Sequence, residues 1–213
     1  MKKNLLILGA LMLAIIGSAF ISGDPETESL ALGTKAPMQD YKMQDFMGKG
    51  HNLKTLAKEE GLLVIFSCNT CPFVVGREGK SEGWEGRYNE LYKAAVSANI
   101  GMVLVNSNEA KRGDADSKSA MAAQAKSKGY QMPYVIDQNH QLADAFGART
   151  TPHVFLFNGA MELVYKGAID DNVDAARAVQ EPWLINAMRS LANDEEITVS
   201  STKPIGCSIK RVK

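Results

Sequence analysis

The residue types best suited to chemistry are two cysteines three positions apart, Cys68 and Cys71, in the segment FSCNTCPF at positions 66–73. They follow a continuous apolar run at 62–66, which is typical of a strand buried on both faces of a sheet. In an α/β domain, reactive groups gather in the loop after such a strand. Pro72 can begin a helix there, and N–H groups at a helix start lower the pKa of a nearby thiol. The pattern predicts a thiolate nucleophile at Cys68 and a partner thiol at Cys71.

Other uses of a cysteine pair fit this sequence less well. A ring that closes over two residues constrains little of the unfolded chain, so a purely stabilising disulfide is disfavoured, whereas a second thiol held nearby suits reversible exchange. Zinc needs two more ligands, and the chain offers only Cys207 and the scattered His51, His140 and His153. A c-type haem requires histidine where Pro72 stands. We therefore expect neither a metal nor another cofactor.

The elements that must position the pair alternate along the chain. Apolar runs predict strands at 62–66, 101–105, 134–136, 154–157 and 162–165, and helical spacing predicts helices at 84–96, 114–128, 142–146 and 184–191. Glycines within 76–83 interrupt any helix that begins after Cys71. Strands that alternate with helices predict an α/β fold of three layers, with a mixed, mostly parallel sheet covered on both faces.

A second pattern lies far downstream, where Thr151 and Pro152 directly precede the expected strand at 154–157. A proline there cannot donate to a sheet ladder, so it marks a turn, with a cis peptide bond as one option. The order of strand, C-x-x-C-P, helix, strand, helix, strand, Thr-Pro, strand and strand resembles the thioredoxin superfamily. Five segments are similar to its redoxin, or AhpC/TSA peroxiredoxin-like, branch across residues 30–211: CNTCPFV, VNSN, TPHVF, YKGAIDDN and GCSIK.

This resemblance implies a thioredoxin-like fold with a redoxin-type extension at 35–56 before the first core strand. It also implies roles for four residues: Cys68 attacks, Cys71 resolves, and Thr151 with a cis Pro152 offers backbone groups to a substrate and keeps the pair free of metal. The implied activity is thiol–disulfide exchange. Its partners are protein or small-molecule disulfides and thiols, together with an electron donor that the sequence does not identify.

The main alternative is a thiol peroxidase, in which Cys68 attacks peroxide and Cys71 or Cys207 resolves the product. Peroxiredoxins usually carry threonine three residues before the attacking cysteine, and Ile65 stands there. They also place an arginine where this chain has Thr-Pro, although Arg149 is close by. Cys207 has a second interpretation, as a small buried apolar residue. A redox sensor or soft-metal chaperone is a third function, but its copper-binding relatives use C-x-x-x-C.

The N-terminus predicts export. Two lysines, an apolar run at 5–16 and the small residues that follow have the layout of a signal peptide, so we expect a signal at 1–23, a linker at 24–34, a redoxin domain at 35–195 and a tail at 196–213. The expected location is periplasmic or extracellular, with membrane attachment only if the first segment is retained. Lysine plus arginine equals aspartate plus glutamate at 24 each, which argues against a nucleic-acid partner.

Overall fold

The computed structural model describes residues 29–213. The expected signal peptide at 1–23 and the first part of the expected linker lie outside the described residues. The rest of that linker contacts the domain, since Leu30 N–H donates to Phe146 O at 3.1 Å and Gly33 N–H donates to Leu163 O at 2.8 Å. In the part of the chain that is described, no helix has the length and apolar character needed to cross a membrane.

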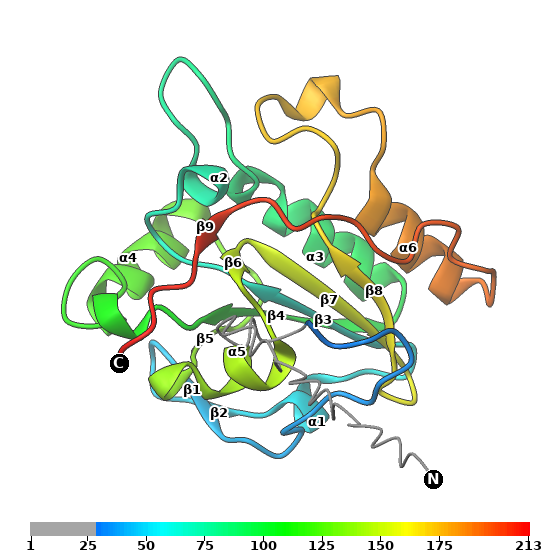
Figure 1. Ribbon diagram of the computed structural model, residues 1–213, viewed down its shortest axis with the longest axis horizontal. Helices are drawn as coiled ribbons and strands as arrows, with labels where there is room; N and C mark the ends of the chain where they lie inside the picture. Colours follow the sequence, from blue (N-terminus) through cyan, green and yellow to red (C-terminus); the bar gives the residue numbers. More distant parts are fainter. Residues whose placement is uncertain (1–28) are drawn as a thin grey trace, which may run out of the picture.

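A central sheet organises the molecule (Figure 1). Its hydrogen-bonded strand orders are β2-β1-β5-β4 and β3-β7-β8. The two groups meet where β4 of the first lies beside β3 of the second. Just beyond the end of β3, Ser67 N–H donates to Val105 O at 2.8 Å. The seven strands are β1 (Met43–Asp45), β2 (Gly50–His51), β3 (Gly61–Phe66), β4 (Ile100–Asn106), β5 (Tyr134–Ile136), β7 (His153–Asn158) and β8 (Leu163–Gly167).

The sheet is mixed, as expected, but most of its assigned strand pairs are antiparallel, so the expected excess of parallel pairs is not found. Strand β4 pairs with β5 in parallel, whereas β1 with β2, β1 with β5, β3 with β7, and β7 with β8 are antiparallel. The reason is the connection between β7 and β8, a turn of four residues that leaves no room for a crossover helix. The short strands β1 and β2 form the expected N-terminal extension.

The helices confirm the sequence prediction in kind, with shifted starts. The predicted helix at 84–96 is a 3₁₀ turn (Glu85–Arg87) followed by α3 (Tyr88–Ser97), and that at 114–128 begins only at α4 (Lys118–Lys128). The side chain of Ser117 caps α4 by accepting Ala120 N–H at 3.3 Å. The remaining helices are α1 (Leu53–Leu56), α2 (Pro72–Val75), α5 (Gln141–Phe146) and α6 (Trp183–Ala192), with further 3₁₀ turns at Glu109–Lys111, Gln138–His140 and Ala176–Ala178.

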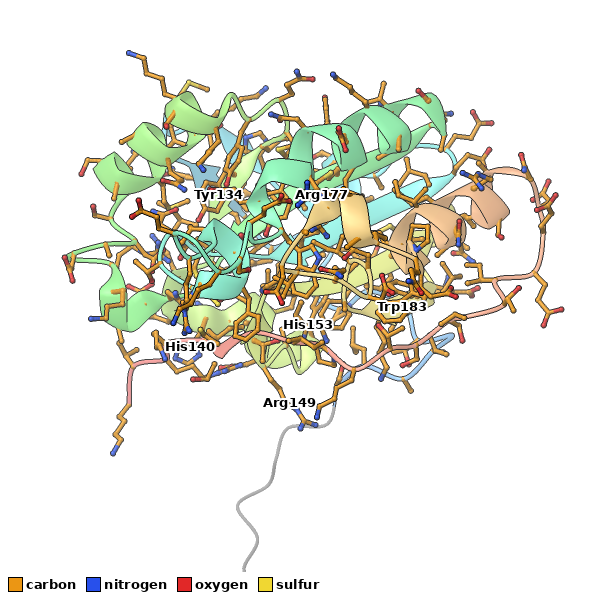
Figure 2. The ribbon with its side chains drawn as sticks, turned by 90° about the horizontal axis from the view of Figure 1, so that it is seen from above. Tyr134, His140, Arg149, His153, Arg177 and Trp183 are labelled. Carbon is orange, nitrogen blue, oxygen red and sulfur yellow. The ribbon has the colours of Figure 1, made fainter. Side chains whose placement is uncertain are left out.

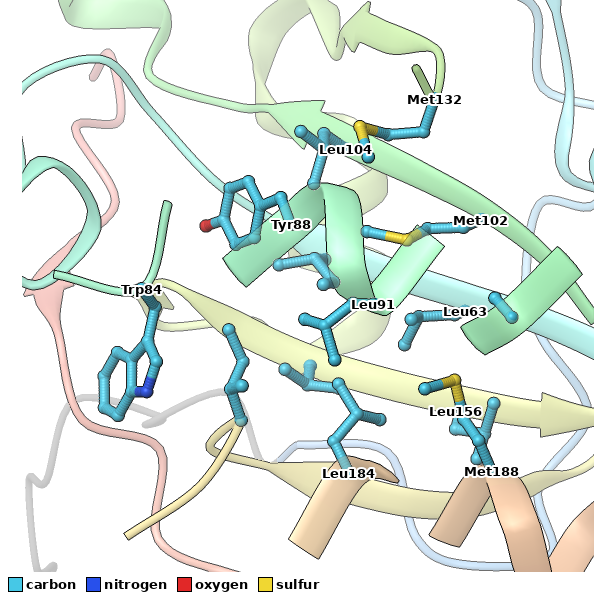
Figure 3. Packing of buried hydrophobic residues seen from close by; sticks show 14 of the residues in the cluster. Leu63, Trp84, Tyr88, Leu91, Met102, Leu104, Met132, Leu156, Leu184 and Met188 are labelled. Atoms are coloured by element: carbon cyan, nitrogen blue, oxygen red, sulfur yellow. The ribbon is translucent and has the colours of Figure 1, made fainter. Parts of the chain in front are cut away.

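Alternate residues of each core strand enter two different hydrophobic clusters, which gives the three layers. On β3, Leu63 and Ile65 join the cluster covered by α3, α4 and α6, which Figure 3 shows around Tyr88 and Leu91. Leu62, Val64 and Phe66 join the other cluster, under α1 and α5. Both faces of the sheet are therefore buried, as the continuous apolar runs predict.

The C-terminal tail, residues 196–213, folds back across the domain (Figure 1). Its short strand β9 (Cys207–Ser208) pairs antiparallel with β6 (Thr150–Thr151). The tail is fixed upstream, where Thr202 N–H donates to Lys166 O at 3.0 Å, and downstream, where Ile209 N–H donates to Arg149 O at 2.9 Å. Figure 2 shows Arg149 and His140 beside this segment, where His140 Nε2 lies 3.3 Å from Val212 O.

Candidate redox site

The cysteine pair lies where β3 ends, in the loop that leads into α2. Cys68 is the second residue after β3, and Cys71 occupies the position before the first turn of α2, with Pro72 at the start of the helix. The helix ends at Val75, and Gly76 then has φ +85°, so the glycine-rich segment does interrupt it. Both cysteines are almost fully covered, with exposed fractions of 2% for Cys68 and 3% for Cys71.

The loop between the cysteines is held by a buried polar network. Asn69 N–H donates to Asp116 Oδ1 at 2.9 Å, and the Asn69 side chain donates to Ala115 O at 2.9 Å. The hydroxyl of Tyr134 donates to Asn69 Oδ1 at 3.0 Å. Asn106, at the end of β4, donates to both Asp116 and Tyr134 at 2.7 and 2.8 Å. The network fixes the backbone that carries the two thiols.

Sequence reasoning did not single out this network. The segment VNSN, which contains Asn106, resembles the redoxin branch without implying a role for any of its residues, and the resemblance does not include Asp116. A cue was present, because polar side chains directly after a fully apolar strand need partners inside the fold. Nothing in the sequence indicates that those partners are the residues of the cysteine loop.

Thr151 and Pro152 form the opposite wall of the site, and the peptide bond between them is cis, as predicted. The hydroxyl of Thr151 lies 3.1 Å from Cys68 Sγ. Cys71 N–H also donates to Cys68 Sγ at 3.3 Å, while the Cys71 thiol donates to Thr151 O at 2.9 Å. The structure therefore brings the four predicted residues together in one cluster.

Cys207 completes this cluster from the tail. Its N–H donates to Cys71 Sγ at 3.2 Å, and it is the register partner of Thr151 in the β6–β9 pair. All three cysteines are free thiols, and Cys207 is half-buried, not fully buried. Gly206 permits the close approach, because a Cβ at this position would lie 2.3 Å from Thr151 O.

Contacts within the cluster split the pKa values of the thiols. The hydrogen bond between Cys68 and Cys71 raises the pKa of Cys68, and burial adds to this rise. The same bond lowers the pKa of Cys71 to about 5, with further help from the thiol and N–H of Cys207. The predicted lowering at Cys68 is thus found at Cys71, because a neighbouring thiol acts on it directly while α2 has only four residues.

One contact opposes ionisation of Cys71. The Thr151 carbonyl oxygen, 2.9 Å from Cys71 Sγ, is an acceptor and favours a protonated thiol there. The surroundings of Cys68 favour a thiolate, since Cys71 N–H and the Thr151 hydroxyl can both donate to its sulfur. Coupled groups of this kind titrate as a pair. After the first ionisation the two cysteines therefore share one proton, which either sulfur has partners to accommodate.

The segment 76–83 packs against a second loop beside the pair. Glu82 N–H donates to Asp174 O at 3.0 Å, and Gly83 N–H donates to Val173 O at 3.1 Å. A hollow of about 220 Å³ separates this segment from α2, with Phe73, Arg77 and Lys80 in its lining. The segment thus has a fixed position next to the redox pair.

The histidines have partners or surroundings of their own. His51 Nε2 lies 3.0 Å from Asp45 Oδ2, and His140 Nδ1 lies 2.6 Å from Asp144 Oδ2. His153, labelled in Figure 2, begins β7, and its ring packs on Phe155 at a centroid distance of 4.5 Å. Burial, followed by the charges of Lys166 and Arg149, lowers the pKa of His153 to about 3.

The sequence pattern of the Redoxin family matches residues 31–180. The chain belongs to the Redoxin family. The match spans the cysteine loop, the Thr151-Pro152 turn and every strand of the central sheet. It stops before α6 and the tail, so Cys207 lies beyond the matched region. No curated protein matches the sequence.

Solved structures show the same fold. A hypothetical protein from Sinorhizobium meliloti 1021 is similar with a TM-score of 0.76 and 28% identity, over 87% of this chain and 97% of that protein. An uncharacterized conserved protein from Geobacillus kaustophilus is similar with a TM-score of 0.75 and 25% identity, over 85% and 93%. Peroxidoxin BcpB from Mycobacterium tuberculosis shares the fold with a TM-score of 0.56 and 13% identity, over 76% and 97%. The chain therefore has a thioredoxin-like redoxin fold.

Proposed function

We propose that this redoxin is a thiol–disulfide oxidoreductase that uses Cys68 and Cys71 as its redox pair. The observation that carries the proposal is the cluster in which both thiols contact Thr151 and each other. Two thiols that are hydrogen-bonded to each other can close a disulfide with little movement of the backbone. A nearby second thiol also releases a trapped mixed disulfide rapidly.

The shared proton supports attack by Cys68. As a substrate disulfide approaches, Cys68 transfers its proton to the Cys71 thiolate along the hydrogen bond between them. Cys71 can hold that proton, because its thiol then donates a hydrogen bond to the Thr151 carbonyl oxygen at 2.9 Å. The Cys68 sulfur then forms a bond to one substrate sulfur and the other leaves as a thiolate. Loss of the Cys71 proton lets Cys71 displace the substrate from Cys68, which leaves a Cys68–Cys71 disulfide.

The test is a trapping experiment with Cys71→Ser. We expect this variant to accumulate mixed disulfides between Cys68 and partner proteins, because the resolving thiol is gone. Cys68→Ser/Cys71→Ser is the matched control and should form none through position 68. A Cys71→Ser variant that stays free of mixed disulfides under mild oxidation would count against the proposal.

Peroxide reduction is the second candidate, and the third thiol favours it. Cys207 contacts Cys71, so the site holds two thiols that can resolve a sulfenic acid on Cys68. However, the partners of the Cys68 sulfur are the neutral Thr151 hydroxyl and Cys71 N–H, not a cation. Stopped-flow mixing with hydrogen peroxide separates the two functions. Rapid sulfenylation of Cys68 in this experiment would support peroxidase activity and contradict thiol–disulfide exchange as the main function.

The proposed setting is outside the cytoplasm, where disulfide chemistry persists. This part of the proposal rests on the signal-like sequence at 1–23. The proposed partners are disulfides and thiols of exported proteins or small molecules, with an external thiol as electron donor.

A further inference from the structure

Three observations about the cluster concern its accessibility. The two cysteines of the redox pair have exposed fractions of 2% and 3%, so the site must open before a substrate disulfide meets Cys68 or an external thiol reaches either sulfur. Cys207 is half-buried and is therefore the cysteine of the cluster with the most solvent-exposed surface. It is also held in place, because the tail is anchored at Thr202 on one side and at Ile209 on the other.

Cys71 is the central sulfur of the three. It contacts Cys68 through their shared hydrogen bond, and it accepts the N–H of Cys207 at 3.2 Å. The thiol of Cys207 also lies within hydrogen-bonding reach of Cys71 Sγ. Cys71 can therefore bond to Cys68 or to Cys207 without a large movement of either segment.

We propose that Cys207 is the entry point for electrons and that it reduces the Cys68–Cys71 disulfide through a transient Cys71–Cys207 disulfide. This inference rests on the proposed function, because it assigns the donor side of the same redox cycle. The Cys207 thiolate attacks Cys71, forming the Cys71–Cys207 bond and releasing Cys68 as a thiolate. An external dithiol then attacks Cys207, releases the Cys71 thiolate, and closes its own disulfide by displacing Cys207 as a thiol.

The surroundings of each sulfur fit these steps. The departing Cys68 thiolate can accept Cys71 N–H and the Thr151 hydroxyl. The pKa of Cys207 is raised to about 11, by burial first and then by the hydrogen bond and charge of Cys71, against the lowering effect of Lys210 and Arg77. Once Cys71 is in a disulfide, its contribution to the rise disappears. Cys207 is thus kept protonated while the pair is reduced and becomes a better nucleophile when the pair is oxidised.

A first experiment maps the proposed bond in Cys68→Ser. One equivalent of diamide should form an intramolecular disulfide in this variant, and trypsin should release residues 59–77 joined to residues 190–210. The pairing is overturned if Cys68→Ser gives only intermolecular disulfides or unreacted thiols while the wild type closes Cys68–Cys71.

A second experiment measures the path of electrons. Oxidised wild type, Cys207→Ser and the control Ser208→Ala are mixed with dithiothreitol, quenched with acid, and labelled with a maleimide to count reduced pairs. Cys207→Ser should be reduced roughly tenfold more slowly, because it loses a thiol held at high effective concentration, whereas Ser208→Ala should match the wild type. Equal or faster reduction of Cys207→Ser overturns the relay.

Failure of the relay is distinguishable from failure of the proposed function. Trapping through Cys68 in the Cys71→Ser variant does not require Cys207, so it is repeated in Cys71→Ser/Cys207→Ser. If trapping persists and the rate at which dithiothreitol reduces Cys207→Ser equals that of the wild type, only the proposed relay is contradicted. Loss of trapping in Cys71→Ser itself removes the proposed function.

Discussion

Gly206→Ala tests whether the tail controls access to the redox pair without removing any thiol. The added Cβ would lie 2.3 Å from Thr151 O and 2.7 Å from the carbonyl carbon of Thr151, against the 3.4 Å at which ordinary contact begins. The tail must therefore move by about 1 Å at this point, which is the difference between 3.4 Å and 2.3 Å. A shift of this size breaks the hydrogen bond from Cys207 N–H to Cys71 Sγ and weakens the β6–β9 pair.

The expected effect follows from these lost interactions. Two hydrogen bonds contribute about 2 kcal/mol, which corresponds to a roughly 30-fold larger population of the open tail. The assay is alkylation of the reduced protein with iodoacetamide, followed by mass spectrometry of residues 59–77, which contain Cys68 and Cys71 but not Cys207. The rate of labelling of this peptide should rise by a similar factor.

The control is Gly50→Ala, since a Cβ at Gly50 meets no atom within 4 Å. It should leave the labelling rate unchanged. If Gly206→Ala also leaves the rate unchanged while its thermal unfolding matches that of Gly50→Ala, then the tail does not cover the pair in solution, and the reasoning from the 2% and 3% exposed fractions is refuted.

Two further predictions concern the support of the site. Asn69→Ala removes the side-chain bonds to Ala115 O and from Tyr134, so it should lower the free energy of unfolding by about 1–2 kcal/mol and slow reaction with a small aromatic disulfide; wild-type values for both would contradict the positioning role. His153 has its pKa lowered to about 3, so the unfolded chain binds a proton below about pH 6.5 that the native protein does not. Stability should therefore fall from about pH 6.5 towards pH 3 by up to ~1.4 kcal/mol per pH unit, and His153→Gln should flatten this decline in urea titrations; equal slopes would contradict it.

Local patterns determined most of the fold. The run at 62–66 predicts a strand because every residue in it is apolar, and β3 covers it with one more residue, Gly61. The pairing direction was not determined, because the burial of a strand on both faces fits parallel and antiparallel neighbours alike. The start of α4 also differs from the predicted start at residue 114, because Ser117 caps the helix and its first turn begins at Lys118.

For the site, the local residue pattern predicts the chemistry of the pair. The spacing of Cys68 and Cys71 after a buried strand, with Thr151-Pro152 before another, predicts a redox pair against a cis proline, and the structure brings these four residues together. Spacing within one loop is a local property, and β3 and β7 are adjacent strands. The spacing follows from a short stretch of sequence, whereas the adjacency of the two strands was implied only by the resemblance in the order of the elements.

The position of Cys207 and the pKa values of the thiols depend on contacts between segments that are distant in the sequence. Cys207 is 136 positions from Cys71, and its approach depends on a tail held by backbone hydrogen bonds, which leave no periodic trace in the sequence. The pKa values depend on which donors face each sulfur. That is a property of distances between segments, and it moved the lowered pKa from Cys68, where the sequence predicts it, to the central sulfur of Cys71.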